Sequence, residues 1–256
     1  MQPTKKVAIL TGSSSGIGFA VAKKIASKGY NIVLGSRHPE AAVRALREQY
    51  SVEVVPVAGD IAHKSTTASL LSAATELGGV DALLLNHGGP PVKAFMEVSE
   101  DEWSKYFDVM VQGPLRLLRE AIPLFESGGG GRVVAISSFT VKMPYPRIIL
   151  SNSLRAALVN ALKTIAQELG DKQILVNSVG PGYIATDRLI EWNKSHAESE
   201  GLSIEEINAR ATANIPLKRH GTPEEVAELI YFLLSVQNGY LTGQNILVDG
   251  GLITAA

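Results

Sequence analysis

Short apolar runs alternate with stretches of helical periodicity along the chain. Residues 5–12 (KKVAILTG) form an apolar run that ends at Gly12, and residues 18–29 (GFAVAKKIASKG) carry apolar side chains at helical spacing. Residues 181–222 follow no such pattern and are expected to be irregular. The same patterns predict further strands at 31–36, 52–60, 81–86, 132–137, 173–180 and 245–250, and helices at 39–50, 66–77, 103–126, 151–169 and 223–235.

Each predicted strand is a continuous apolar run, which indicates that both faces of the sheet are covered. Because strands alternate with helices, we expect a parallel sheet with right-handed crossovers. No linker, repeat or charge block divides the chain, and Gly128 to Gly131 look like a flexible helix-to-strand turn. The expected fold is one α/β domain over residues 1–256, a Rossmann-type doubly wound parallel sheet of about seven strands with helices on both faces.

Composition narrows the possible functions. The 256 residues are 45% hydrophobic and 19% charged with a net charge of −1, so there is no basic footprint for nucleic acid or an anionic membrane. No apolar run approaches the roughly 18 residues of a membrane span, and the N-terminus lacks a signal-peptide design. The chain has no cysteine, and its five histidines share no metal-ligand spacing. We expect a cytoplasmic protein without disulfides or a metal site.

A glycine-rich turn links the first strand to the first helix. In TGSSSGIG (residues 11–18), Gly12 suits a tight turn, and Gly16 and Gly18 let the backbone approach a pyrophosphate at the helix N-terminus. A glycine triplet alone also fits an ordinary strand-to-helix turn. The order of strand, turn and helix favours dinucleotide binding.

Further motifs follow the ends of later strands. They are GDI at 59–61, LNHG at 85–88, Ser138 at a strand end, PG at 181–182 and TGQNILVDGG at 242–251. Together with the glycine-rich turn they resemble the short-chain dehydrogenase/reductase family, in order and spacing, over essentially the whole chain. Within that family the chain resembles the 3-oxoacyl-[acyl-carrier-protein] reductases, as a divergent member.

The resemblance implies a nicotinamide cofactor and the residues that would hold it. Asp60 would accept a hydrogen bond from the adenine amine, and Asn86 would line the cofactor groove. Arg155 could hold the nicotinamide ribose or bind an anionic group of the substrate. Asp60 and Asn86 could instead cap strand ends, and Pro181-Gly182 could be a plain turn. The implied cofactor-binding residues are Gly12, Ser14, Ser15, Gly16, Ile17, Gly18, Ser36, Arg37, Asp60, Ile61, Asn86, Gly88, Arg155, Pro181, Gly182, Ile184 and Thr186.

The residues after the second strand bear on the choice between NAD and NADP. An acidic residue there would bind the ribose diol of NAD, whereas this chain has Ser36 and Arg37, which both suit a 2′-phosphate. NADP is therefore favoured. Two points leave NAD open: Ser15 stands where many NADP-preferring relatives have a basic residue, and Arg37 could stack on adenine or stay solvated.

The catalytic residues of the family are largely replaced. Family enzymes use Asn, Ser, Tyr and Lys, with the tyrosine as acid or base and the lysine lowering its pKa. Alignment on Ser138 puts Ser151 at the tyrosine position, Arg155 at the lysine position and Met110 at the asparagine position. Because an aliphatic hydroxyl is several pK units less acidic than a phenol, Ser151 is a poor acid in this role.

Other groups could compensate for this loss. Tyr145 lies on the segment between Ser138 and Ser151, and could be a relocated acid or an aromatic packed between two prolines. His87 could titrate near physiological pH or simply line the groove. Ser151 could be merely the N-cap of its helix. The candidate catalytic residues are Ser138, Ser151, Arg155 and Tyr145.

The resemblance predicts an NAD(P)(H)-binding oxidoreductase that transfers hydride to or from a small carbonyl or alcohol substrate. The alternative is an inactive dinucleotide-binding protein that serves as a sensor or subunit. A nonredox lyase or isomerase has no specific support. In the family, residues 184–220 form a substrate lid, where Ile184, Leu189 and Trp192 suggest an apolar pocket or lid packing.

The predicted helices at 103–126 and 151–169 carry apolar side chains over more than one face. A helix that is hydrophobic on several sides must bury a second surface. In the family these two helices pair with their copies across a two-fold axis, and the C-terminal strand region forms another interface. We expect a homotetramer, with a dimer as the alternative.

Overall fold

The computed structural model describes residues 5–255, except the side chains of residues 188, 191, 192, 195, 196, 198 and 199. Its centre is a seven-stranded parallel sheet in the order β3-β2-β1-β4-β5-β6-β7, which confirms the predicted doubly wound fold. The strands are β1 (Val7–Thr11), β2 (Asn31–Ser36), β3 (Val54–Ala58), β4 (Ala82–Leu85), β5 (Gly131–Ile136), β6 (Ile174–Pro181) and β7 (Asn245–Val248).

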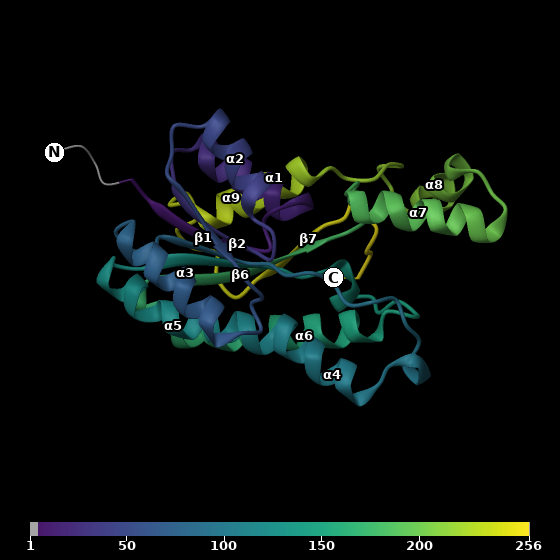
Figure 1. Cartoon of the computed structure of the whole chain (residues 1–256). Helices are drawn as coiled ribbons and strands as arrows, with labels where there is room; N and C mark the ends of the chain where they lie inside the picture. The colour runs from purple at the N-terminus through teal and green to yellow at the C-terminus, as the bar shows by residue number, and fades with distance from the viewer. Residues whose placement is uncertain (1–4, 256) are drawn as a thin grey trace.

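Helices cover both faces of the sheet (Figure 1). One face carries α1 (Gly16–Ser27), α2 (Glu40–Gln49) and α9 (Pro223–Leu234), and the other carries α3 (Lys64–Glu76), α5 (Gly113–Ser127) and α6 (Ile149–Glu168). The helices α4 (Glu100–Phe107), α7 (Asp187–Glu200) and α8 (Ile204–Thr212) lie toward the carboxyl ends of the strands. None of the described helices is long and apolar enough to cross a membrane.

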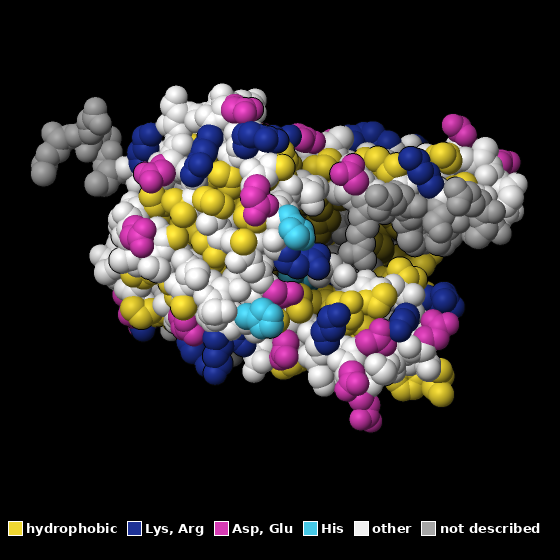
Figure 2. Space-filling view, in the orientation of Figure 1, with side chains coloured by type: hydrophobic (Ala, Val, Ile, Leu, Met, Phe, Trp, Pro, Cys, Tyr) yellow, Lys and Arg dark blue, Asp and Glu magenta, His cyan; other side chains and the backbone are white. Residues whose placement is uncertain are grey.

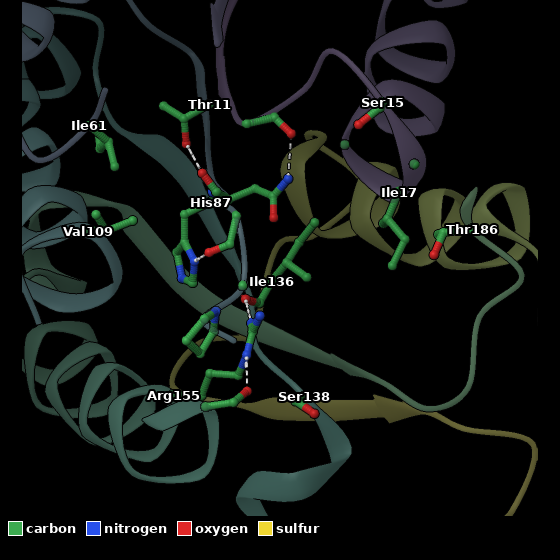
Figure 3. Close-up of a pocket in the computed structure, with 18 of the residues that line it drawn as sticks. Thr11, Ser15, Ile17, Ile61, His87, Val109, Ile136, Ser138, Arg155 and Thr186 are labelled. Carbon is green, nitrogen blue, oxygen red and sulfur yellow. Dashed lines mark hydrogen bonds between the residues drawn. The ribbon is translucent and has the colours of Figure 1, made fainter. Parts of the chain in front are cut away.

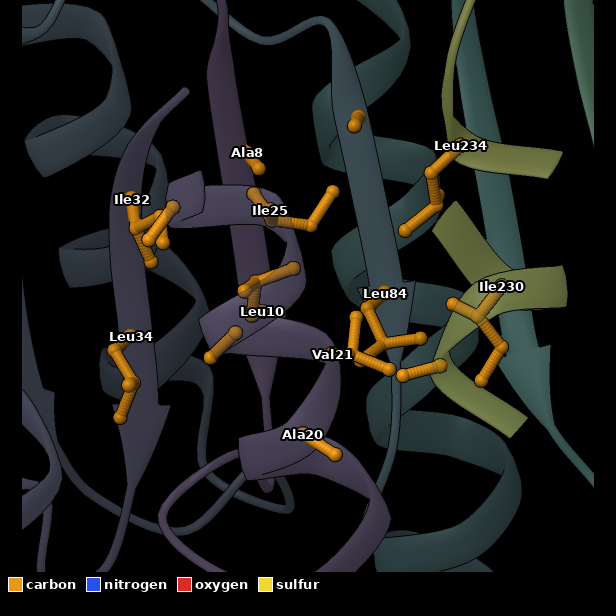
Figure 4. Packing of buried hydrophobic residues seen from close by; sticks show 14 of the residues in the cluster. Ala8, Leu10, Ala20, Val21, Ile25, Ile32, Leu34, Leu84, Ile230 and Leu234 are labelled. Carbon is orange, nitrogen blue, oxygen red and sulfur yellow. The ribbon is translucent and has the colours of Figure 1, made fainter. Parts of the chain in front are cut away.

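Two apolar cores form because successive strand residues point to opposite faces of the sheet. Leu10 packs with α1 and α9 in one core, whereas its neighbour Ile9 belongs to the core under α3, α5 and α6. Figure 4 shows Val21 of α1 and Ile230 of α9 in the first core, where neither is exposed. Burying a side chain of this size stabilises the fold by about 1.5–3 kcal/mol relative to exposure.

Three helices begin at a hydroxyl residue that is followed three positions later by glutamate. The hydroxyl accepts a hydrogen bond from the glutamate N–H, and the carboxylate accepts one from the N–H of the capping residue. These paired bonds fix where each helix begins. The pairs are Ser99 with Glu102 before α4, Ser203 with Glu206 before α8, and Thr222 with Glu225 before α9.

Three sequence predictions differ from the structure. The helix expected at 103–126 is α4 and α5, joined by a π-helical turn at Asp108–Gln112. The segment expected to be irregular contains α7 and α8, so that prediction was wrong. The helix expected from Ser151 begins at Ile149 with Ile148 as its N-cap, so the N-cap interpretation of Ser151 was also wrong.

Candidate active site

A cavity of about 680 Å³ opens at the carboxyl ends of the strands. The strand order reverses between β1 and β4, which is where open α/β sheets bind their ligands. Figure 2 shows the hollow between the body of the molecule and the arm formed by α7 and α8. Every residue that the sequence nominated for the cofactor lines it, and so do Ser138, Ser151 and Arg155; Tyr145 is not part of the lining.

The glycine-rich turn packs too closely against neighbouring backbone to accept side chains at Gly12 and Gly18. Gly12 has φ +57°, and a Cβ there would lie 2.8 Å from the carbonyl oxygen of Asn86. A Cβ on Gly18 would lie 2.6 Å from the carbonyl oxygen of Gly12. The α1 N-cap, Ser15, makes no side-chain cap bond, and the first turn of α1 has no acidic residue. The turn therefore suits a bound anion such as a pyrophosphate.

Asn86 joins this turn to the end of β4 by hydrogen bonds. Its Nδ2 donates to the carbonyl oxygen of Gly12 at 2.7 Å, and its backbone N–H donates to Oγ1 of Thr11 at 2.9 Å. The Oδ1 atom of Asp60 accepts from the backbone N–H of Ala62 at 2.9 Å. Asp60 and Asn86 thus make local hydrogen bonds near strand ends, as in the capping alternative, and they also line the cavity.

The end of β2 brings hydroxyl groups and a cation together. The Oγ atoms of Ser14 and Ser36 lie 2.7 Å apart, and the backbone N–H of His38 donates to Ser36 Oγ at 3.3 Å. Arg37 is exposed at the edge of the same cavity. Hydroxyl groups beside a guanidinium are suited to a phosphate.

Arg155 ties α6 to the end of β5. Its Nε donates to Ser151 Oγ at 3.1 Å, one helical turn earlier, and its Nη1 donates to the carbonyl oxygens of Ile136 at 3.0 Å and Ser137 at 2.7 Å (Figure 3). The guanidinium is therefore held in place by the protein itself and lies in the wall of the cavity.

Ser138 was predicted from the sequence to occupy the position of the family's catalytic serine. It caps the short helical turn after β5, and its Oγ accepts from the backbone N–H of Thr140 at 3.2 Å and from Thr140 Oγ1 at 3.0 Å. A hydroxyl oxygen that accepts two hydrogen bonds still has its own proton to donate. Ser138 can therefore donate to an oxygen in the cavity.

Two further positions were named from the sequence. Met110 is fully buried, packs with Leu150 and Leu154, and does not line the cavity. His87 Nδ1 lies 2.9 Å from the carbonyl oxygen of Gly88, and its Nε2 is buried without a partner among the described residues. Burial, assisted by the charge of Arg155, lowers the pKa of His87 to about 3. His87 is therefore neutral at pH 7 and does not titrate near physiological pH.

Sequence reasoning missed Tyr183, which lines the cavity directly after Pro181-Gly182. Burial raises the pKa of Tyr183, and the nearby phenol of Tyr145 raises it further. Tyr145 itself is 49% exposed, and its carbonyl oxygen accepts from Asn152 Nδ2 at 2.8 Å. The Pro181-Gly182 motif, which directly precedes Tyr183, is the sequence feature that could have identified it.

The lid residues chosen from the sequence divide into two groups. Ile184 and Leu189 line the cavity, in accord with an apolar wall. The side chain of Trp192 lies outside the described residues.

The chain is similar to known proteins over nearly its whole length. A family profile described as enoyl-(acyl carrier protein) reductase matches residues 12–253. Human dehydrogenase/reductase SDR family member 4 is 32% identical over 253 residues, which cover 96% of this chain and 87% of that protein.

Two solved structures resemble the whole chain. L-sorbose reductase from Gluconobacter frateurii, complexed with NADPH and L-sorbose, has a TM-score of 0.94 and 32% identity, covering 99% of this chain and 98% of that one. An NADPH-bound short chain oxidoreductase from Pseudomonas aeruginosa PAO1, described as containing an atypical catalytic center, has a TM-score of 0.89 and 27% identity over 99% of this chain and 100% of that one. The chain therefore belongs to the short-chain dehydrogenase/reductase family of oxidoreductases.

Proposed function

We propose that this chain is an NAD(P)(H)-dependent oxidoreductase that prefers NADP(H) and acts on a small carbonyl or alcohol substrate. The main support is the cavity beside the point where the strand order reverses. Its lining includes the N-terminus of α1, which no side chain caps, together with Ser36 and Arg37. The NADPH complexes of similar reductases support the choice of cofactor.

Each part of the cofactor has a matching part of the cavity. The turn from Gly12 to Gly18 holds the pyrophosphate, Asp60 and Ile61 hold the adenine, and Ser36 with Arg37 holds the 2′-phosphate. The nicotinamide is bordered by Pro181, Gly182, Ile184 and Thr186. When bound, the cofactor supplies a hydride, that is, one hydrogen with two electrons.

The protein's own groups act on the substrate oxygen. The Ser138 hydroxyl donates a hydrogen bond to it, and the fixed positive charge of Arg155 favours the negative charge that develops there. Ser151 accepts from Arg155 and helps to orient it. Helices α7 and α8, within the lid segment 184–220, cover the substrate and exclude water.

We further propose that four copies assemble as a homotetramer. Support comes from β7, which is an edge strand with half-exposed side chains, and from Val236 and Tyr240 beside it, which are 68% and 98% exposed. An open strand edge and exposed apolar side chains favour contact with another chain. A cytoplasmic location remains a prediction from the sequence.

Fluorescence titration with NADPH and NADH tests the cofactor assignment. We expect tighter binding of NADPH, and we expect Arg37→Asp to weaken NADPH binding by about 10–100-fold, because a hydrogen bond to a charged group contributes about 1.5–3 kcal/mol. NADH binding should change little.

Arg44→Asp is the matched control, since Arg44 is an exposed arginine on α2 outside this cavity. It should leave both affinities unchanged. An unchanged NADPH-to-NADH ratio in Arg37→Asp would exclude the phosphate contact. Failure of both cofactors to bind at millimolar concentration would overturn the proposed function.

A further inference from the structure

The two groups assigned to the substrate oxygen, Ser138 and Arg155, both depend on the backbone of Ser137. Ser138 is the next residue in the chain, and Arg155 Nη1 donates to the carbonyl oxygen of Ser137 at 2.7 Å. The Ser137 N–H donates to the carbonyl oxygen of Val179 at 2.7 Å, and Ser138 lies beyond the paired residues of β5 and β6. Contacts that fix Ser137 therefore fix both groups.

The side chain of Ser137 is held by β7, the outermost strand of the sheet. Its Oγ donates to Oδ1 of Asn245 on β7 at 2.8 Å. The Oγ of Ser178, on β6, donates to the same Oδ1 at 3.0 Å. Both serines are buried. One amide oxygen thus connects β6 and β7 with the residue that follows β5.

Neither serine hydroxyl depends on Asn245 for its only acceptor. Ser137 Oγ lies 3.0 Å from the carbonyl oxygen of Val179, and Ser178 Oγ lies 3.3 Å from the carbonyl oxygen of Gln244. A buried hydroxyl that loses every acceptor destabilises the fold, but here a backbone acceptor stays within reach of each. What the amide adds is a second contact that restricts where Ser137 can lie.

The strand ends pack closely around Ser138. A Cβ on Gly180 of β6 would lie 3.1 Å from the carbonyl oxygen of Ser138 and 2.7 Å from the side chain of Leu247 on β7. The backbone of Ser138 therefore lies directly against β6. Ser137 lines the cavity, whereas Asn245 does not, so an effect of Asn245 on the reaction passes through Ser137.

We propose that Asn245 is a positioning residue whose amide oxygen holds Ser137, and through it the Ser138 hydroxyl and the Arg155 guanidinium, in place for the substrate oxygen. The inference rests on the proposed function. Supporting hydrogen bonds of this kind keep reacting groups within about 0.5 Å of their productive geometry. A misplacement of about 1 Å can lower a rate by about 100-fold.

The test replaces Asn245 with two side chains of similar size. Asn245→Leu removes the acceptor and should lower kcat for NADPH-dependent reduction of an activated ketone by about 10-fold, part of the effect of a 1 Å misplacement. Asn245→Asp keeps an acceptor oxygen for both serines and should retain most of the wild-type kcat. The Kd for NADPH should not change in either variant, since Asn245 lies outside the cavity lining.

A double-mutant cycle shows whether the effect passes through Ser137. Ser137→Ala removes the other partner of the same hydrogen bond, so combining it with Asn245→Leu should lower kcat no further than the larger single effect. Gln244→Leu is the matched control, because the exposed Gln244 side chain donates to the carbonyl oxygen of Thr242, and it should keep kcat. Rates are taken per chain that binds NADPH, and light scattering checks that each variant keeps the wild-type mass.

The outcomes separate the positioning role from the proposed function. Wild-type kcat in Asn245→Leu would overturn the positioning role and leave the reductase function intact. Losses that multiply in the double variant, or an Asn245→Asp variant as slow as Asn245→Leu, would overturn it too. If Asn245→Leu loses NADPH binding together with activity, Asn245 supports the fold and does not position the reacting groups. A wild-type protein that binds NADPH and reduces no carbonyl would contradict the proposed function, and the positioning role with it.

Discussion

At the scale of single residues, the shape of the Arg155 side chain determines which groups it binds. A lysine ammonium is one compact donor on a flexible stem, whereas a guanidinium has donors that point in several directions. Arg155 uses this shape to bind Ser151 and two carbonyl oxygens at the end of β5. Its positive charge thus lies in the cavity wall, and the same side chain joins α6 to the sheet by hydrogen bonds.

The buried imidazole of His87 should make stability depend on pH. The pKa of His87 is about 3 in the folded chain and about 6.5 when unfolded, so below pH 6.5 the unfolded chain binds a proton that the folded chain does not. Stability is therefore lost as pH falls from 6.5 toward 3, by at most about 1.4 kcal/mol per pH unit for one proton.

Urea unfolding between pH 7 and pH 5 measures this contribution. The free energy of unfolding should fall less steeply in His87→Gln than in the wild type, whereas His38→Gln, at an exposed position, should match the wild type. Equal slopes for all three proteins would show that His87 is protonated in the folded state.

At the scale of elements, the strands and most helices could be predicted because a local sequence pattern marks each of them. Continuous apolar runs mark buried strands, and the glycine-rich turn lies between a strand and a helix. Helices α7 and α8 were missed, although Ser203 and Glu206 form a readable cap before α8.

The residues nominated for cofactor binding could be predicted to lie in one cavity for a similar reason. Its residues follow strand ends, and the ends of parallel strands meet at one edge of the sheet. The Ser14–Ser36 contact was not predictable, since it joins side chains from separate segments whose packing no local pattern describes.

Helix α6 places Ser151 and Arg155 one turn apart on the same face, which allows a rescue experiment. Changing Ser151→Tyr and Arg155→Lys together should raise kcat by about 10-fold or more, because a phenol beside an ammonium group supplies a better acid. Arg155→Lys alone is the control and should give no gain. A folded, NADPH-binding double variant with no gain would show that this face of α6 cannot deliver a proton.

At the scale of the whole molecule, the described surface carries apolar side chains near the open edge of the sheet. Val236, Tyr240 and Leu241 lie between α9 and β7, and Tyr240 is almost fully exposed. Phe107, at the end of α4, is also exposed, at 45%. A second copy of the chain would cover such positions, as in the assembly predicted from the sequence.

Light scattering measures this assembly in solution. We expect the mass of a tetramer at micromolar concentration, and a smaller species for the double variant Val236→Asp, Tyr240→Asp, because buried charges oppose the contact. Arg44→Asp, on the exposed side of α2, should keep the wild-type mass. A monomeric wild type would contradict the proposed homotetramer.

The central claim is that the cavity binds NADP(H) and uses it to reduce a carbonyl group. The most direct measurement is the rate at which the purified wild-type protein oxidises NADPH with a panel of small ketones and aldehydes, alongside the same panel with NADH. We expect carbonyl-dependent oxidation of NADPH that is faster than that of NADH and is slowed by Arg37→Asp. If NADPH binds but no carbonyl causes its oxidation, the proposed reductase function is contradicted, and the chain is a dinucleotide-binding protein without turnover.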